Sequence, residues 1–224
     1  MNIKNNINNL RQGIPPNCRL IAVSKTNPVE KLKEAYDAGQ RAFGENRVQE
    51  LIPKFEALPK DIEWHMIGHM QSNKVKYVAP FIHLIHSVDS YNLLEEINKQ
   101  ATKIKQTISC LLQIHIAEEE SKFGFSEQEA FDLLHSESIK KFNHVAIVGL
   151  MGMATFTDDK NQVRKEFKGL KTFFEKLKGP NLPSNVLMKE LSMGMSGDYK
   201  IALEEGSTMI RIGTAIFGER NNTA

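Results

Sequence analysis

Apolar and polar positions follow two different periods along this chain of 224 residues. Short apolar runs such as Leu20–Val23 have the length and composition of buried strands. Longer segments such as Asp158–Leu177 place an apolar residue at every third or fourth position, as amphipathic helices do. The two kinds of segment alternate from about residue 20 onward. This pattern predicts parallel strands that are covered by helices.

We predict eight strands, each followed by a helix or a helical turn. The strands are expected at Leu20–Val23, Ala42–Gly44, Glu63–Gly68, Phe81–Val88, Ile108–Ile116, Val145–Met151, Val186–Leu191 and Met209–Ile212. The helices are expected at Val29–Ala38, Arg47–Leu58 (interrupted at Pro53), Ser72–Tyr77, Ser90–Lys103, Glu127–Leu134, Asp158–Leu177, Tyr199–Leu203 and Ala215–Phe217. One further helix should precede the first strand, because Ile3, Ile7 and Leu10 fall on one helical face.

Eight strand–helix units of this kind predict the α/β class and a single closed (β/α)8 TIM barrel with an extra N-terminal helix. An open, doubly wound sheet is the structural alternative. The chain contains no linker rich in Gly, Ser or Pro and no low-complexity tract. We therefore expect residues 1–224 to form one domain.

Charge and cysteine content narrow the choice of partners and compartment. The 29 Lys and Arg residues nearly balance the 27 Asp and Glu residues, which gives no electrostatic basis for binding nucleic acid. No apolar run approaches the roughly 18 residues that a membrane helix needs. Cys18 and Cys110 are far apart and lack metal-like spacing, so we interpret them as reduced thiols. The sequence predicts a cytoplasmic protein that binds neither nucleic acid nor membrane.

A lysine stands where the first apolar run ends. Lys25 follows Leu20–Val23 in the stretch AVSKTNP, and in a parallel barrel the C-terminal strand ends form the active face. Asn27, Pro28 and Glu30 suit the cap, first residue and capping-box acid of the next helix. An amine held among apolar neighbours is a candidate Schiff-base nucleophile, although an isolated lysine at a strand end most often only reaches solvent.

Two C-terminal stretches place small residues at strand-to-helix junctions. LSMGMSGD (Leu191–Asp198) follows the seventh strand, and GSTMIRIGTAIFG (Gly206–Gly218) spans the eighth. Such junctions leave backbone N–H groups at a helix N-terminus, and small side chains let a phosphate approach them. Because the loops after strands 7 and 8 are the recurrent phosphate site of TIM barrels, we predict phosphate binding here.

Closure of the barrel would bring this phosphate site beside Lys25, because strand 8 pairs with strand 1. A phosphate site next to an amine suits a phosphorylated aldehyde or ketone, which is either pyridoxal 5′-phosphate (PLP) or a phosphosugar. Arg211 lies two residues before Gly213 and is expected to point inward. A guanidinium only donates hydrogen bonds, so Arg211 would hold a pyridine nitrogen unprotonated and weaken the ring as an electron sink.

Six stretches together carry a family resemblance: AVSKT, FGENRVQE, WHMIGHMQSNKVKY, GLMGMAT, LSMGMSGDY and GSTMIRIGTAIFG. With them the chain, from about residue 3 to residue 218, resembles the pyridoxal phosphate homeostasis protein (YggS/PROSC) family. The resemblance implies a fold similar to the N-terminal barrel of bacterial alanine racemase. It also implies PLP bound as a Schiff base, a role in supplying and buffering PLP, and no established catalytic turnover.

The resemblance assigns a cofactor site residue by residue. It implies that Lys25 forms the Schiff base, that Arg211 faces the pyridine nitrogen and that Asn46 lies near the cofactor ring. It places these residues around the phosphate: Ser192, Met193, Ser196, Gly213 and Thr214. The chain departs from the family at His69-Met70, where proline and leucine are usual, and at His115, where asparagine is usual.

Three hypotheses about function follow. The first, which we favour, is a monomeric protein that holds PLP on Lys25, acts in intracellular PLP homeostasis and supplies PLP-dependent apoenzymes. The second is an amino-acid racemase, which needs acid/base groups on both faces of the substrate carbon. In the racemases the second group comes from an additional C-terminal domain and the opposing subunit, and this chain ends at Ala224. The third is a Schiff-base aldolase, for which a carboxylate–lysine pair is missing from the predicted strand ends.

We expect no metal site, because the seven histidines are scattered. His65 and His69 are four residues apart, but this spacing spans a strand end and so loses its helical meaning. His69 and His115 are interpreted as polar residues at the rim of the pocket.

Three further residues stand out in the sequence. Met151 and Met153 form a small methionine cluster, which at a strand predicts apolar core packing. Lys122 matches a short family motif that would attract phosphate or a second PLP, and a solvent-exposed lysine is an equally good interpretation.

Overall fold

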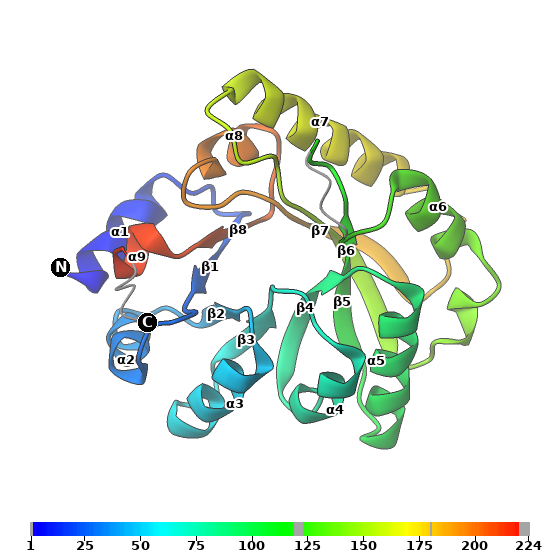
Figure 1. Ribbon diagram of the computed structural model, residues 1–224, viewed down its shortest axis with the longest axis horizontal. Coiled ribbons are helices and arrows are strands. Elements are labelled where there is room, and N and C mark those ends of the chain that lie inside the picture. The colour runs from blue at the N-terminus through cyan, green and yellow to red at the C-terminus, as the bar shows by residue number, and fades with distance from the viewer. Residues whose placement is uncertain (1, 119–122, 180, 220–224) are drawn as a thin grey trace.

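The computed structural model describes residues 2–118, 123–179 and 181–219. In these residues eight strands alternate with helices that lie around the outside of the strands (Figure 1). The strands are β1 (Arg19–Val23), β2 (Ala42–Glu45), β3 (Glu63–Met66), β4 (Ile82–Val88), β5 (Ile108–Ile114), β6 (Val145–Gly152), β7 (Val186–Ser192) and β8 (Met209–Ile212). The helices are α1 (Ile3–Gln12), α2 (Val29–Asp37), α3 (Val48–Ala57), η1 (Ser72–Lys74), α4 (Val75–Val78), α5 (Tyr91–Lys103), α6 (Glu127–His135), η2 (Ile139–Lys141), α7 (Lys160–Lys176), α8 (Tyr199–Glu204) and α9 (Thr214–Phe217).

The eight strands are hydrogen-bonded in chain order into one closed parallel barrel. The barrel closes between β1 and β8, where Ile21 is level with Arg211 and Ala22 with Ile212. The predicted (β/α)8 TIM barrel is therefore confirmed, and the open-sheet alternative is wrong. The predicted extra helix is α1, which lies beside α9 in Figure 1, and the Asn6 Nδ2 donates a hydrogen bond to the Ile216 carbonyl at 2.9 Å.

Apolar side chains form two layers on either side of the strands. The larger layer lies between the strands and the helices and includes Trp64, Met66 and Phe167. A smaller cluster fills the inside of the barrel: Ile21, Ala42, Leu84, Leu111, Met151 and Met209. Successive residues of a strand point to opposite faces, so His65, between Trp64 and Met66, points into the barrel. No helix within the described residues is long and apolar enough to span a lipid bilayer.

The predicted cap of the second helix is wrong. The cap of α2 is Pro28, with extended backbone and no side-chain hydrogen bond, and the helix begins at Val29. Asn27 instead turns back toward the strand, and its Nδ2 donates to the Lys25 carbonyl at 3.2 Å. The amide side chain thus stabilises the exit of β1 rather than the start of α2.

The predicted interruption at Pro53 is also wrong, because α3 is one continuous helix with Pro53 inside it. Proline removes the hydrogen bond that its own N–H would make to the carbonyl of Gln49, four residues earlier. Burial of Val48 and Leu51 on the core side of α3 stabilises the helix on the N-terminal side of this gap.

Candidate functional site

A cavity of about 340 Å³ lies at the C-terminal strand ends, beside β1 and β8. Six of the eight residues predicted for the cofactor site line it: Lys25, Asn46, Ser196, Arg211, Gly213 and Thr214. These residues come from loops or strand ends as much as 189 positions apart in the chain, counting from 25 to 214. Closure of the barrel between β1 and β8 is what gathers them.

Lys25 lies two residues beyond the end of β1, in a tight turn with Thr26, and is partly buried. Thr26 has a positive φ of 63°, which a non-glycine residue adopts only when its surroundings hold it there. The Thr26 N–H donates to Glu50 Oε2 at 2.7 Å, and the Thr26 hydroxyl donates to the Lys25 carbonyl at 2.6 Å. The backbone that carries Lys25 is therefore fixed from both sides.

Behind this turn lies a buried ion pair that the sequence did not reveal. Lys54 Nζ is 2.6 Å from Glu45 Oε1 and donates to the Ser24 carbonyl at 2.9 Å. The Ser24 hydroxyl donates to the same Glu45 oxygen at 2.6 Å. Burial raises the pKa of Glu45, and the nearby Lys54 opposes that rise. The pair joins α3 to the ends of β1 and β2, directly next to Lys25.

Arg211 enters the cavity from β8 and is only 4% exposed. Its Nη1 donates to the Ser192 hydroxyl at 2.6 Å, and its Nη2 donates to the Gly152 carbonyl at 3.0 Å. Burial lowers the pKa of Arg211 to about 10, while the Asp198 carboxylate acts in the opposite direction. The guanidinium therefore stays charged at neutral pH, and it presents a fixed hydrogen-bond donor group to the cavity.

Ser192 and Met193 do not line the cavity, although the resemblance placed them around the phosphate. Both are fully buried. The Ser192 hydroxyl accepts from Arg211, and the Met193 N–H donates to the Met209 carbonyl at 3.1 Å. In this arrangement the two residues support Arg211 and β8 from behind.

The hydrogen bonds continue from Ser192 into the barrel. The Ser192 hydroxyl is 2.9 Å from His86 Nδ1, and His86 Nε2 is 2.9 Å from His65 Nδ1. Both imidazoles are completely buried, and burial holds their pKa values well below the usual range for histidine. The two histidines are therefore neutral at neutral pH, and each ring has one nitrogen that donates and one that accepts.

The loops after β7 and β8 supply backbone donors to the cavity. Within the described residues, no protein group accepts a hydrogen bond from the N–H of Ser196, Gly197, Gly213 or Thr214. A Cβ at Gly213 would lie 3.2 Å from the Val23 carbonyl oxygen, so a larger residue would crowd the junction of β1 and β8. Four uncommitted N–H groups beside a buried arginine form a suitable site for a phosphate group.

Sequence reasoning missed the apolar rim of this cavity. Met153, Phe156 and Met195 line it and are exposed by 42%, 97% and 36%. The core packing predicted for Met151 is confirmed, but the same prediction for Met153 is wrong. Met153 lies just after β6 ends, in a loop, where the strand alternation that suggested burial no longer applies.

The remaining candidates lie elsewhere. The exposed His69 pairs with Asp89 at 2.7 Å and stands in a neighbouring cavity of about 590 Å³, which shares Asn46 with the first. His115 follows β5, is partly buried, and its N–H donates to the Phe125 carbonyl at 2.9 Å. Lys122 falls outside the described residues.

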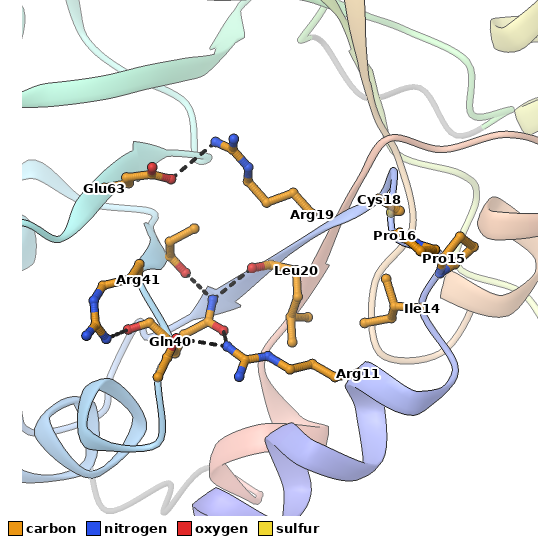
Figure 2. Close-up of a pocket in the computed structure, with 12 residues that line it drawn as sticks. Arg11, Ile14, Pro15, Pro16, Cys18, Arg19, Leu20, Gln40, Arg41 and Glu63 are labelled. Carbon is orange, nitrogen blue, oxygen red and sulfur yellow. Dashed lines mark hydrogen bonds and ion pairs between the residues drawn. The ribbon is translucent and has the colours of Figure 1, made fainter.

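A further cavity, of about 350 Å³, lies at the opposite end of the barrel beside the first residues of β1, β2 and β3 (Figure 2). Its three arginines already have partners: Arg11 donates to the Gly39 carbonyl, Arg19 pairs with Glu63, and Arg41 pairs with Asp61. This cavity lacks a lysine and, among the described residues, a cation without a protein partner. The cavity at the C-terminal strand ends is therefore the candidate functional site.

A family model, similar curated proteins and similar solved structures agree with one another on the relatives of this chain. Residues 1–221 match the family model described as alanine racemase, N-terminal domain. A pyridoxal phosphate homeostasis protein of Aquifex aeolicus (strain VF5) is 41% identical over 212 residues, which cover 94% of this chain and 91% of that protein.

Among solved structures, PipY of Synechococcus elongatus PCC7942 is similar over 96% of this chain and 100% of its own. Its form without PLP is 37% identical with a TM-score of 0.90. Its form with PLP bound is 36% identical, again over 96% and 100% of the two chains, with a TM-score of 0.86.

Proposed function

Because this chain belongs to the family of pyridoxal phosphate homeostasis proteins, we propose that it binds PLP at the C-terminal end of its barrel and acts in PLP homeostasis. The observation that carries this proposal is a cavity lined by an amine, a buried guanidinium and four backbone N–H groups that have no acceptor within the described residues. The cavity's volume of about 340 Å³ falls in the range usual for small-molecule sites.

Each part of the cavity suits one part of PLP. The Lys25 amine would hold the aldehyde group of PLP covalently, with water as the leaving product. The N–H groups of Ser196, Gly197, Gly213 and Thr214 bind the phosphate. Arg211 would donate a hydrogen bond to the pyridine nitrogen, and because a guanidinium does not release its proton, that nitrogen would stay unprotonated.

Arg211 also supports a holding role over catalytic turnover. PLP supplies an electron sink for carbanion chemistry, and that sink is strongest when the ring nitrogen is protonated. A guanidinium held by Ser192 and Gly152 cannot give up a proton to the ring at neutral pH, because its pKa stays at about 10. The residues around the ring thus favour binding PLP over activating a substrate.

The proposal includes delivery of PLP by a cytoplasmic monomer to PLP-dependent apoenzymes. The exposed rim of Met153, Phe156 and Met195 at the mouth supports transfer by direct contact, because it offers an apolar surface around the bound cofactor. A rate of PLP transfer that rises with the apoenzyme concentration would support direct contact between the two proteins. A transfer rate equal to the rate of spontaneous PLP release would contradict direct contact.

Borohydride reduction tests the attachment site. Reduction of the PLP-loaded protein should fix the cofactor on one peptide, the peptide that contains Lys25. Lys25→Ala should abolish the Schiff-base absorption, whereas the control Lys33→Ala removes an exposed amine and should leave it unchanged. Trapping at another lysine, or an unchanged spectrum in Lys25→Ala, would show that the assignment is wrong.

A second measurement separates the carrier from a racemase. The PLP-loaded protein is incubated with single-enantiomer amino acids in deuterated water. We expect no α-deuteration beyond that of free PLP, and multiple turnovers would exclude a role limited to holding PLP.

A further inference from the structure

The end of the barrel opposite Lys25 gathers three side chains of metal-ligating chemistry. Glu63 is the first residue of β3, His65 follows two positions later, and His83 is the second residue of the neighbouring β4. The register between the two strands shifts at Trp64/His65. Within the described residues, one ligand atom from each of Glu63, His65 and His83 lies within 4.8 Å of the other two. We propose that these three residues bind a divalent transition-metal ion of the zinc type.

The donor set fits this class of ion. Two imidazoles and one carboxylate are a common ligand set for zinc, with a water in the fourth position. In a tetrahedral site with bonds of about 2.0–2.1 Å, neighbouring ligand atoms are about 3.4 Å apart. The present separations, all within 4.8 Å, would have to shorten by up to about 1.4 Å. The exposed His83 and the partly buried Glu63 can supply this shortening by rotating their side chains, while His65 stays fixed in the barrel.

His65 is the strongest argument for the site. Its Nδ1 is 2.9 Å from His86 Nε2, whereas its Nε2 is buried and, among the described residues, has no hydrogen-bond partner. A buried polar atom without a partner is costly and uncommon. Histidines that bind metals usually bond through one nitrogen and donate from the other to a second group, which here is His86. A metal ion on Nε2 would satisfy the one side-chain nitrogen of His65 that has no partner in the described residues.

The group that competes with a metal ion here is Arg19. Its Nη1 is 3.2 Å from Glu63 Oε2, an ion pair drawn in Figure 2, and 3.5 Å from His83 Nε2. The Arg19 side chain is 44% exposed, so it can swing into water, and exposed pairs of this kind contribute little to stability. Arg19 is therefore expected to weaken metal binding without preventing it, and removing its charge should tighten binding.

Metal titration of the full-length, untagged protein, dialysed against a chelator and loaded with PLP, tests the proposal. Zn²⁺ binding is followed by calorimetry, and Co²⁺ binding by its visible absorption bands, whose intensity reports tetrahedral coordination. We expect one equivalent of metal to bind. Glu63→Gln and His83→Ala should each weaken binding by at least about tenfold. Arg19→Gln should tighten it severalfold, and the control His135→Ala, an exposed histidine on α6, should leave it unchanged.

The variants lie at exposed or partly exposed positions, and circular dichroism checks that each one is folded. The absence of saturable binding to the wild-type protein overturns the proposal. So does an affinity that both Glu63→Gln and His83→Ala leave unchanged. The PLP spectrum is recorded in parallel, because the site and the Lys25 cavity lie at opposite ends of the barrel, and failure of one assignment leaves the other standing.

Discussion

Replacing Lys54 with methionine should destabilise the protein strongly, because it leaves the charge of Glu45 buried without its partner. Lys54→Met preserves most of the side-chain volume but removes the ammonium group, which lies 2.6 Å from Glu45 Oε1 and 2.9 Å from the Ser24 carbonyl. The Glu45 side chain is 0% exposed, and its other oxygen, Oε2, already has no partner among the described residues. Within the part of the chain that the structure describes, the Ser24 hydroxyl alone would still bond to the carboxylate.

The burial of this ion pair determines the expected loss in the free energy of unfolding. Removing one partner of a buried ion pair costs about 3–5 kcal/mol, far more than the roughly 0–1 kcal/mol of an exposed pair. The matched control is Lys33→Met, because Lys33 and Asp37 form a pair whose side chains are 64% and 59% exposed. Urea unfolding, followed by the fluorescence of the buried Trp64, measures both variants. With a slope of about 3 kcal/mol per molar urea, the midpoint of Lys54→Met should fall by roughly 1–2 M.

The loss should also depend on pH, with a definite sign. The pKa of Glu45 is raised in the folded protein by burial, and Lys54 is the largest influence that lowers it. An acid whose folded pKa lies above its unfolded value favours folding when protonated, and this contribution is lost as the pH rises through the folded pKa. Removing Lys54 raises the folded pKa of Glu45 further. The deficit in unfolding free energy of Lys54→Met relative to wild type should therefore shrink as the pH falls from about 7.5 to about 5.

A loss in Lys54→Met no larger than in Lys33→Met would refute this reasoning, and so would a loss that is the same at both pH values. The double variant Glu45→Gln with Lys54→Met provides a further check. It removes the unpaired charge, so it should be more stable than Lys54→Met alone at neutral pH.

Two further predictions concern the loop and the arginine beside the cavity. Gly194→Ala should lower the free energy of unfolding in urea by about 1–3 kcal/mol, because φ at this position is +96° and the new Cβ would lie 2.6 Å from the Cβ of Ala202. The control Gly169→Ala lies inside α7, where a Cβ would meet no other described part of the chain within 4 Å. It should raise the free energy of unfolding by about 0.5–1 kcal/mol. Ser192→Ala removes the acceptor of Arg211 Nη1, one of the two acceptors of the guanidinium within the described residues, and should cost about 1–3 kcal/mol of stability. It should also weaken PLP binding as measured by absorbance, and an unchanged PLP affinity would show that Ser192 does not position Arg211.

The sequence predicted the order of elements well, because periodicity is a local property. All eight strands, the N-terminal helix and the barrel class followed from short apolar runs that alternate with amphipathic segments. Errors arose where the surroundings of a residue, rather than its type, decided its local structure. Asn27 bonds to the Lys25 carbonyl rather than capping α2, and Pro53 remains inside α3. Neither choice can be read from residue type, because both depend on what packs against the segment.

The candidate site was predictable in outline for a topological reason. Parallel strands present their C-terminal ends on one face, and closure makes the first and last strands neighbours, so Lys25 and Arg211 had to approach one another once a barrel was inferred. What could not be predicted was which polar residues behind the cavity support it. Lys54 on α3 reads in the sequence as an ordinary helical lysine, and only the fold brings it to Glu45.

The sequence by itself determined the barrel, the face that carries the chemistry and six of the fifteen residues that line the cavity, because each of these follows from local pattern, connectivity or a recognisable motif. Only the tertiary structure decided which buried polar groups find partners. Ser192 faces Arg211 and His86 rather than the cavity, and His65 keeps one nitrogen that has no partner among the described residues. The tertiary structure also decided that Met153 lies at an exposed rim. These outcomes depend on contacts between residues far apart in the chain, and those residues come close together only when the barrel closes.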